Sequence, residues 1–245
     1  MTESTPQPGG ALVDNPWGRP LGVLVSPNPT FDALRRQPTW VPAAIVLMVL
    51  YLAIQALVFQ RMDMESAVRE QLSSRGGEMS EEQIDQAVAI QSKVGLGCAV
   101  VTFPLGIAAM AGLFLGLIHL AGGEIGFRRS LAVSLHGLMP QSVASLLAIP
   151  LVLGREEISV EEASQGRILA SHLGAFAPAD VSPVVAALLG RIDVFSLWAI
   201  LLLIIGFHRV AGISKGAATG IVLALWLVWV GLAVGGAALG AFGGG

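Results

Sequence analysis

The sequence predicts an all-α protein that is embedded in a membrane and crosses the bilayer five times. Hydrophobic residues make up 54% of the chain and charged residues 13%, whereas a soluble domain carries about 25% charged residues. The mean hydropathy is +0.73. Four stretches without Asp, Glu, Lys or Arg are long enough to cross a hydrocarbon core of about 30 Å at about 1.5 Å per residue. They are residues 37–60, 94–123, 130–154 and 216–245.

A fifth apolar stretch lies between Asp193 and Arg209 and is short for a full crossing. It spans the bilayer if Arg191 and Asp193 extend outward and Trp198 lies near an interface. The expected spans are about residues 40–59, 95–121, 131–153, 193–208 and 216–241. They form one membrane domain over residues 21–242, with a flexible polar N-terminus at 1–20, outer helical loops at 60–93 and 154–190, and a glycine tail at 243–245.

The segment before the first span predicts a short amphipathic helix at the membrane surface. Asn28 is expected to cap it, with Pro29 at its first position. Phe31 and Leu34 then share one face, and the helix ends in arginines that suit anionic headgroups on the inner surface. Residues 1–10 are polar and hold no positive start followed by a hydrophobic stretch, so we expect no cleavable signal peptide.

Both long loops contain signals for helix starts. Ser80 and Gln83 form a capping box, and the helix that they begin is expected to run into the second span. A second capping box begins at Ser159, and its helix is expected to stop at Gly174. A further helix is expected to start after Ser182. The acidic residues in these loops are most simply the solvated faces of interfacial helices.

The orientation follows from the basic residues at the ends of the spans. With the N-terminus inside, inner and outer segments carry seven basic residues each, so the totals do not decide. The two short loops do decide, because they place Arg128, Arg129, Arg209 and Lys215 on one side. Lysine is rare and Ala, Gly and Leu are abundant, as is typical of a GC-rich bacterial genome. We therefore expect a bacterial cytoplasmic membrane protein with its N-terminus inside.

Composition and motifs exclude several functional classes. A net charge of −3 gives no electrostatic basis for binding nucleic acid. Cys98 is the one cysteine, so the chain has no intrachain disulfide and no cysteine-based zinc site. The sequence contains no nucleophile elbow, phosphate-binding loop, HExxH motif or pair of aspartates within the spans. We expect neither enzymatic activity nor a cofactor.

Three segments resemble the bacterial branch of the Yip (Ypt-interacting protein) family. They are SPNPTFDALRRQPTW at 26–40, GEIGFRRSLAVSLHGLMP at 123–140 and RIDVFSLWAILLLIIG at 191–206. The positions that carry the resemblance are Pro27, Phe31, Trp40, Gly126, Phe127, Pro140, Asp193, Phe195 and Trp198. The resemblance covers most of residues 22–230 and implies a polytopic, all-helical membrane protein. Eukaryotic members bind prenylated Rab GTPases, but this chain lacks the long acidic N-terminal domain that would engage a GTPase.

Small residues recur four positions apart in the second and fifth spans. Such ridges let helix backbones approach closely within a membrane. We expect these residues to pack the two spans against each other or against a second copy of the chain. The residues are Ala108, Gly112, Gly116, Gly231 and Gly235.

Polar residues within the spans have simple structural interpretations. Ser142 and Ser145 follow Pro140, which frees a backbone carbonyl that hydroxyls can satisfy; a polar solute path is the alternative. His119, His136 and His208 are expected on one side of the membrane. They are candidates for a metal site, although interfacial histidines more often reach headgroups or bond a carbonyl.

Two functions from different classes remain open. The first is a non-enzymatic membrane scaffold or organiser that binds a partner protein or shapes the bilayer. The second is a small-solute transporter or channel, which would keep ionisable groups near the midplane. Of the ionisable residues, His136 alone lies deep in a span, and this favours the scaffold. The expected partners are the lipid bilayer and either an unknown protein or a second copy of the chain.

Overall fold

The computed structural model describes residues 10–66, 68–69, 80–159, 163, 168–178 and 181–243. It confirms an all-α membrane fold, with five helical segments long and apolar enough to cross a bilayer. The fourth segment, expected to be short, is 18 residues long. The five segments are Val41–Arg61, Gly97–Leu120, Phe127–Leu153, Val194–Ala211 and Lys215–Gly236.

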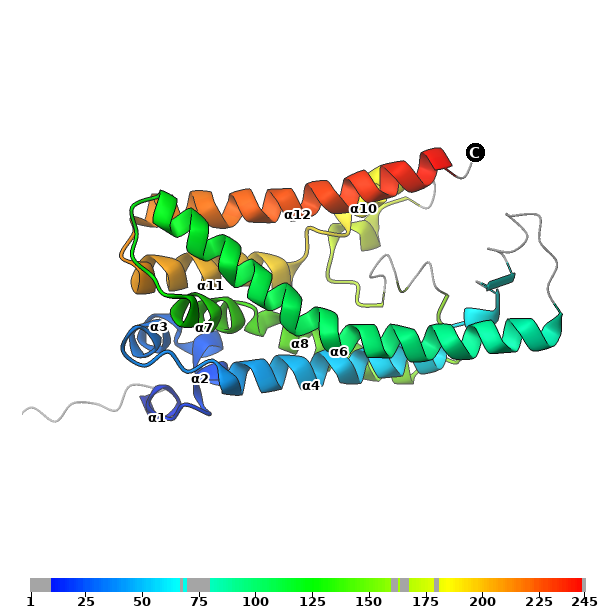
Figure 1. Cartoon of the computed structure of the whole chain (residues 1–245), viewed down its shortest axis with the longest axis horizontal. Helices are drawn as coiled ribbons and strands as arrows, with labels where there is room; N and C mark the ends of the chain where they lie inside the picture. Colours follow the sequence, from blue (N-terminus) through cyan, green and yellow to red (C-terminus); the bar gives the residue numbers. More distant parts are fainter. Residues whose placement is uncertain are drawn as a thin grey trace, which may run out of the picture.

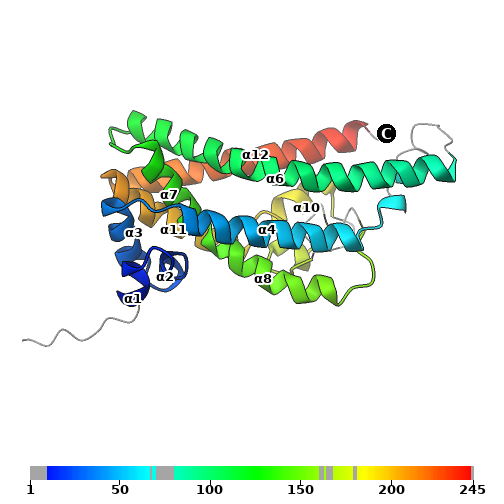
Figure 2. The ribbon, with the colours of Figure 1, turned by 60° about the horizontal axis from the view of Figure 1, so that its bottom comes forward.

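The long helices run roughly along one axis, and three short helices gather at one end (Figures 1 and 2). The elements are α1 (Gly10–Asp14), α2 (Arg19–Val25), α3 (Pro27–Arg36), α4 (Val41–Arg61), α6 (Glu81–Leu120), α7 (Phe127–Gly137), α8 (Met139–Leu153), the 3-10 turn η1 (Leu173–Phe176), α10 (Pro183–Leu189), α11 (Val194–Ala211) and α12 (Lys215–Gly243). We call the end with α1, α2, α3 and the connections 121–126 and 212–214 the basic end. The opposite end, where α4 and α8 finish and α6 begins, is the distal end.

The surface helix predicted before the first span is α3, but it differs from the prediction in two respects. It begins at Pro27, so Asn28 lies inside the first turn and does not cap it. Its apolar face contacts α11 and α7 instead of lipid. Phe31 and Leu34 are fully buried there, because an apolar stripe gains from any partner that excludes water.

Gly206 is what allows α3 to approach α11 so closely. A Cβ atom at this position would lie 2.7 Å from ring carbon Cε1 of Phe31 and 2.7 Å from Cγ1 of Val133. Phe114 of α6 completes the cluster, with its ring centroid 4.4 Å from that of Phe207. The main hydrophobic core therefore includes aromatic residues packed near the basic end.

The third span is broken into α7 and α8 at Leu138, two residues before Pro140. The Ser142 hydroxyl donates to the Met139 carbonyl at 2.6 Å, and the Ser145 hydroxyl donates to the Gln141 carbonyl at 2.9 Å. Both bonds satisfy carbonyls next to the proline, but neither reaches the His136 carbonyl, which is the one that Pro140 leaves without its helical donor. They give no support to a solute path through these hydroxyls.

The two capping boxes have different outcomes. Ser80 and Gln83 cap α6 as predicted, and α6 runs for 40 residues from the loop through the second span. The helix predicted after Ser159 falls largely outside the described residues. Of its described residues, Ala163 is helical and its amide donates to the Ser159 carbonyl at 3.0 Å. The later part of the prediction is wrong, because residues 168–172 are not helical and η1 extends across the predicted stop at Gly174. Ser182 caps α10 as predicted.

Candidate functional site

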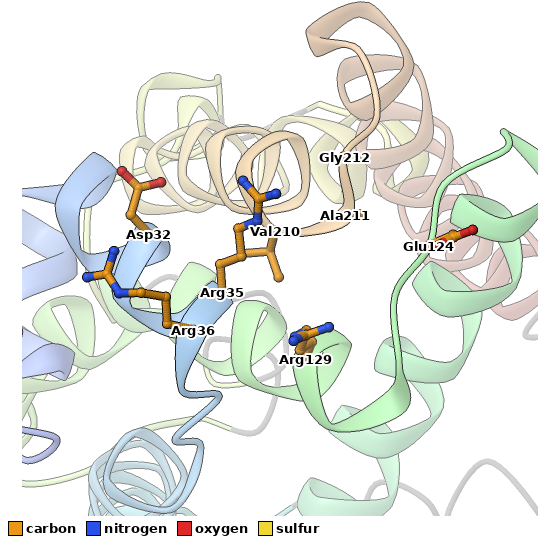
Figure 3. Close-up of a pocket in the computed structure, with 8 residues that line it drawn as sticks. All are labelled: Asp32, Arg35, Arg36, Glu124, Arg129, Val210, Ala211 and Gly212. Atoms are coloured by element: carbon orange, nitrogen blue, oxygen red, sulfur yellow. The ribbon is translucent and has the colours of Figure 1, made fainter.

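The candidate site is an open pocket at the basic end, with a volume of about 620 Å³. Four separate segments surround it: α3, the connection between α6 and α7, the first turn of α7, and the end of α11 (Figure 3). The lining residues are Asp32, Arg35, Arg36, Glu124, Arg129, Val210, Ala211 and Gly212.

Two turns shape the pocket where the chain leaves α6 and α11. Gly212 ends α11 with φ of 70°, and Gly122 follows α6 with φ of 77°. These left-handed conformations favour glycine, because a Cβ atom would clash with the backbone. The Glu124 amide then donates to the Ala211 carbonyl at 3.3 Å, which holds the connection against the end of α11.

Arg209 links α11 to α3 at the edge of the pocket. Its Nη1 donates to Oδ2 of Asp32 at 2.6 Å, and its Nε donates to Oδ1 of Asn28 at 2.9 Å. Both partners of the ion pair are partly exposed, so the pair contributes under about 1 kcal/mol to stability. Its main consequence is geometric, because it sets the position of α3 and pairs the Asp32 carboxylate with a cation.

The remaining arginines of the pocket are exposed and lack such partners. Within the described residues, Arg35, Arg36 and Arg129 make no ion pair closer than 4 Å with a carboxylate. Figure 3 shows Glu124 on the opposite side of the pocket from Arg36. The pocket therefore presents three guanidinium groups available to an anion.

Arg19 lies close enough to Arg36 for their charges to interact, and it is 4% exposed. Its guanidinium donates to the carbonyls of Val13 and Gln37 at 3.0 and 2.9 Å, and to the hydroxyl of Thr39 at 2.7 Å. Burial lowers the pKa of Arg19, and the nearby positive charge of Arg36 lowers that pKa further. Arg19 thus joins α1 and α2 to the connection before α4 and adds positive charge close to Arg36.

Comparison with known proteins places this architecture in a family. The chain matches the Yip1 domain over residues 21–237. The protein belongs to the Yip1 domain family. It is 28% identical over 202 residues to the "Membrane protein YknW" of Bacillus subtilis (strain 168), an alignment that covers 80% of each chain. No solved structure matched the chain.

Most of the positions behind the Yip resemblance lie at helix starts. Pro27 is the first residue of α3, Trp40 precedes α4 and Gly126 precedes α7. Asp193 caps α11, because its Oδ1 accepts from the amides of Phe195 and Ser196 at 2.9 and 3.0 Å. Phe31 and Trp198 pack in the main core, while Phe127 is half-exposed and Pro140 begins the second half of the third span. In this Yip1 protein most of these positions start helices or pack in the core. Two of the three segments that contain them, 26–40 and 123–140, also supply pocket residues.

The three candidate histidines do not share a site. His136 is fully buried, and its Nδ1 lies 2.8 Å from the Ala132 carbonyl. Nδ1 of His208 lies 2.8 Å from the Ile213 carbonyl, and His119 is exposed at the end of α6. Over the described residues, no group of three His, Cys, Asp or Glu side chains could hold a metal ion. The structure therefore gives no support to a shared metal site.

The glycines predicted to pack the second and fifth spans make no close contact within the described part of the chain. α6 and α12 do contact each other. However, a Cβ atom added at Gly112, Gly116, Gly231 or Gly235 would meet no described atom of the same chain within 4 Å. Ala108 lines an apolar groove between α4 and α6. Packing through these glycines stays a prediction about contacts between copies.

Two features of the structure have no signal in the sequence. Arg19 is buried close to Arg36, and no local pattern marks an arginine whose acceptors lie six to twenty residues away. His172 lies outside the pocket, near the start of α11; it is 5% exposed, and both of its ring nitrogens lack a partner among the described residues. The pocket itself joins segments far apart in sequence, so no spacing could reveal it.

Proposed function

We propose that this Yip1 family protein is a non-enzymatic membrane scaffold that binds a partner protein at its basic end. The main support for this proposal is that α2 and α3 form a fixed platform on the bundle. Arg209 ties α3 to α11, and Arg19 ties α2 to the connection before α4. The platform presents arginines outside the apolar bundle, and arginine is enriched where proteins recognise one another.

The described spans support this proposal over solute transport. Transporters usually keep ionisable groups near the midplane of the bilayer. In the described spans, His136 is the one residue among Asp, Glu, Lys, Arg and His that lies deep inside. Ser130 donates to the Ala111 carbonyl at 2.7 Å, so its hydroxyl joins α7 to α6.

Site-directed photocrosslinking in native membranes tests the scaffold. A photoreactive residue replaces Arg128, which is exposed at the basic end outside the pocket, or Leu173, which is half-exposed near the start of α11. We expect a discrete adduct with a second protein from position 128 and none from position 173. Equal adducts from both positions, or an adduct with a second copy alone, would overturn partner binding at the basic end. Solute flux through purified protein in vesicles would favour transport.

We further infer that the basic end faces the cytoplasm, with Met1 inside and Gly245 outside. The support is that Arg128, Arg129 and Lys215 join the arginines of α3 at this end, and cytoplasmic segments carry the excess of basic residues. A reporter that is active only in the cytoplasm should be silent when fused after Gly245 and active when fused before Met1. The reverse pattern would show an inverted orientation.

A further inference from the structure

The loop between the third and fourth spans has two parts of different composition. Residues 154–167 contain six charged residues, whereas residues 168–190 contain one, Asp180. The second part includes η1 and α10, and we call its described residues 173–178 and 181–190 the apolar hairpin. Because charged side chains are costly to remove from water, the two parts are suited to different surroundings.

The apolar hairpin leaves the bundle and returns to it at the start of α11. The Leu173 amide donates to the Ile192 carbonyl at 3.0 Å, which joins the two ends of the hairpin. Beside Leu173, His172 is buried, and a Cβ atom at Gly174 would lie 2.9 Å from its Nδ1. The base of the hairpin is therefore packed closely on the bundle.

The base of the hairpin lies at a depth that belongs to the bilayer. The guanidinium carbon of Arg191, which directly follows the hairpin, is 5.7 Å from the centroid of the Trp229 ring in α12. Lys215 begins the fifth span at the basic end, and Trp229 lies about 21 Å farther along α12 at about 1.5 Å per residue. Since the hydrocarbon core is about 30 Å thick, about 9 Å of it extends beyond Trp229 toward the distal end.

α12 and α10 both occupy this remaining depth. Beyond Trp229, α12 continues to Gly243 without a charged or polar side chain, so nothing in its sequence there requires water. α10 contacts α12 and lies beside its C-terminal half (Figure 1). The hairpin is therefore level with an apolar part of the fifth span.

The hairpin also continues the apolar surface of that span. Large apolar side chains of the hairpin are exposed in the chain, and Phe176 is the most exposed of them at 81%. Val185 and Leu188 of α10 are partly exposed as well, next to α12, whose Leu232 is exposed. In water this surface would be costly, whereas acyl chains would cover it without a penalty.

Hydrogen bonds within the hairpin suit a medium without water. The Ala175 amide donates to the His172 carbonyl at 3.1 Å, and the Ala186 amide donates to the Ser182 carbonyl at 2.9 Å. Pro178 and Pro183 have no N–H group and need no acceptor. Irregular backbone at membrane depth is tolerated where protein packs against it, and α12 covers one side of α10.

We propose that the apolar hairpin is immersed in the distal leaflet of the bilayer, where its exposed face binds acyl chains. Lipid is the partner because this face continues the lipid-facing surface of the fifth span at the same depth. Arg191 and Asp193 then lie below the headgroups, where the Trp229 ring and the first amides of α11 are their partners. The inference depends neither on the scaffold proposed above nor on the orientation of the chain.

Collision rates of a spin label test the immersion. The label is attached to Phe176→Cys or Val185→Cys in the full-length chain, with the exposed Cys98 replaced by serine. The protein is placed in vesicles of phosphatidylglycerol and phosphatidylcholine, and collisions of the label with oxygen and with a water-soluble nickel chelate are measured. Because oxygen concentrates in hydrocarbon and the chelate stays in water, we expect a high ratio of oxygen to chelate collisions at both positions.

Two reference positions calibrate this ratio. A label at Leu232→Cys on α12 reports the bilayer, and a label at Glu157→Cys reports the charged part of the same loop. The ratio at positions 176 and 185 should match that at 232 and exceed that at 157 several-fold. A ratio equal to that at 157 would overturn the proposal. Low collision rates with both reagents would overturn it as well, because protein would then cover the face. Phe176 and Val185 are exposed, so folding should persist, and melting curves check this.

Discussion

The basic end and the distal end of the bundle are held together by different kinds of contact. At the basic end, buried side chains from α3, α6, α7 and α11 interlock, and Phe31, Phe114 and Phe207 are among the largest fully buried residues. At the distal end, the described residues form a small buried cluster, with Val58, Val152 and Ile158 at its centre.

At the distal end, hydrogen bonds to the backbone join the segments that follow α4 and α8. The Ile158 amide donates to the Arg61 carbonyl at 2.7 Å, and the Asp63 amide donates to the Ile158 carbonyl at 3.1 Å. Arg61 also donates to the Arg155 carbonyl. Regions with few buried apolar contacts open locally at lower free energy. The comparison therefore indicates a rigid basic end, suited to hold a binding site, and a distal end that opens more readily.

The largest expected difference between the ends comes from two arginines that both bond backbone carbonyls. Arg19→Ala at the basic end should destabilise the protein by about 3 kcal/mol, because buried carbonyls and the Thr39 hydroxyl lose their donor. Arg61→Ala at the distal end should cost about 1 kcal/mol, because its surroundings are more open. Thermal unfolding in detergent measures both. Equal losses would show that the two ends are equally consolidated.

Two glycine substitutions compare a tightly packed position, Gly206, with a position that has no described neighbour in the chain, Gly112. Gly206→Leu should cost about 2 to 3 kcal/mol, because the new side chain displaces Phe31 and Val133. Gly112→Leu, the matched control, meets open space in a single chain and gains about 0.8 kcal/mol of helix propensity.

Thermal unfolding in detergent and size-exclusion elution are measured for both glycine variants. The melting temperature should fall for Gly206→Leu. For Gly112→Leu it should hold or rise if the protein is a monomer in detergent. A drop in the melting temperature or a changed elution for Gly112→Leu would reveal that copies of the chain pack through α6. A neutral Gly206→Leu would contradict the close approach of α3 to α11.

The helix cap at the start of α11 should have a smaller effect. Asp193→Ala removes the acceptor for the amides of Phe195 and Ser196, which should cost about 1 kcal/mol. Ser182→Ala, which removes a longer cap bond of 3.4 Å at the start of α10, serves as the comparison and should cost less. Thermal unfolding of the pair gives the order. A larger loss for Ser182→Ala would contradict it.

The smallest effect is expected where α6 projects from the bundle at the distal end. Ser80→Ala breaks a capping box on an exposed turn, so only the first turns of α6 should open more often. Hydrogen exchange should become faster over residues 81–90, and the melting temperature should stay within about 1 °C of the unmodified value. A clear fall in the melting temperature would show that this segment unfolds together with the core.

Local physics explains the parts of the fold that could be predicted from the sequence. The length and apolarity of the charge-free stretches required five spans, because uncovered backbone groups in lipid must be satisfied within helices. The capping side chains Ser80 and Ser182 marked true helix starts, since a cap depends on residues within one turn. Pro140 marked the region of the break in the third span.

Contacts between distant residues explain the rest. The apolar face of α3 has the same pattern whether lipid or protein covers it, so only the tertiary structure could show that Gly206 and Val133 receive Phe31. Asn28 follows a helix-capping pattern, yet it accepts from Arg209, 181 residues away. The pocket depends on the same kind of contact. Its arginines come from α3 and α7, and their individual charges were visible in the sequence. Their convergence on one cavity was decided by how α3, α7 and α11 pack.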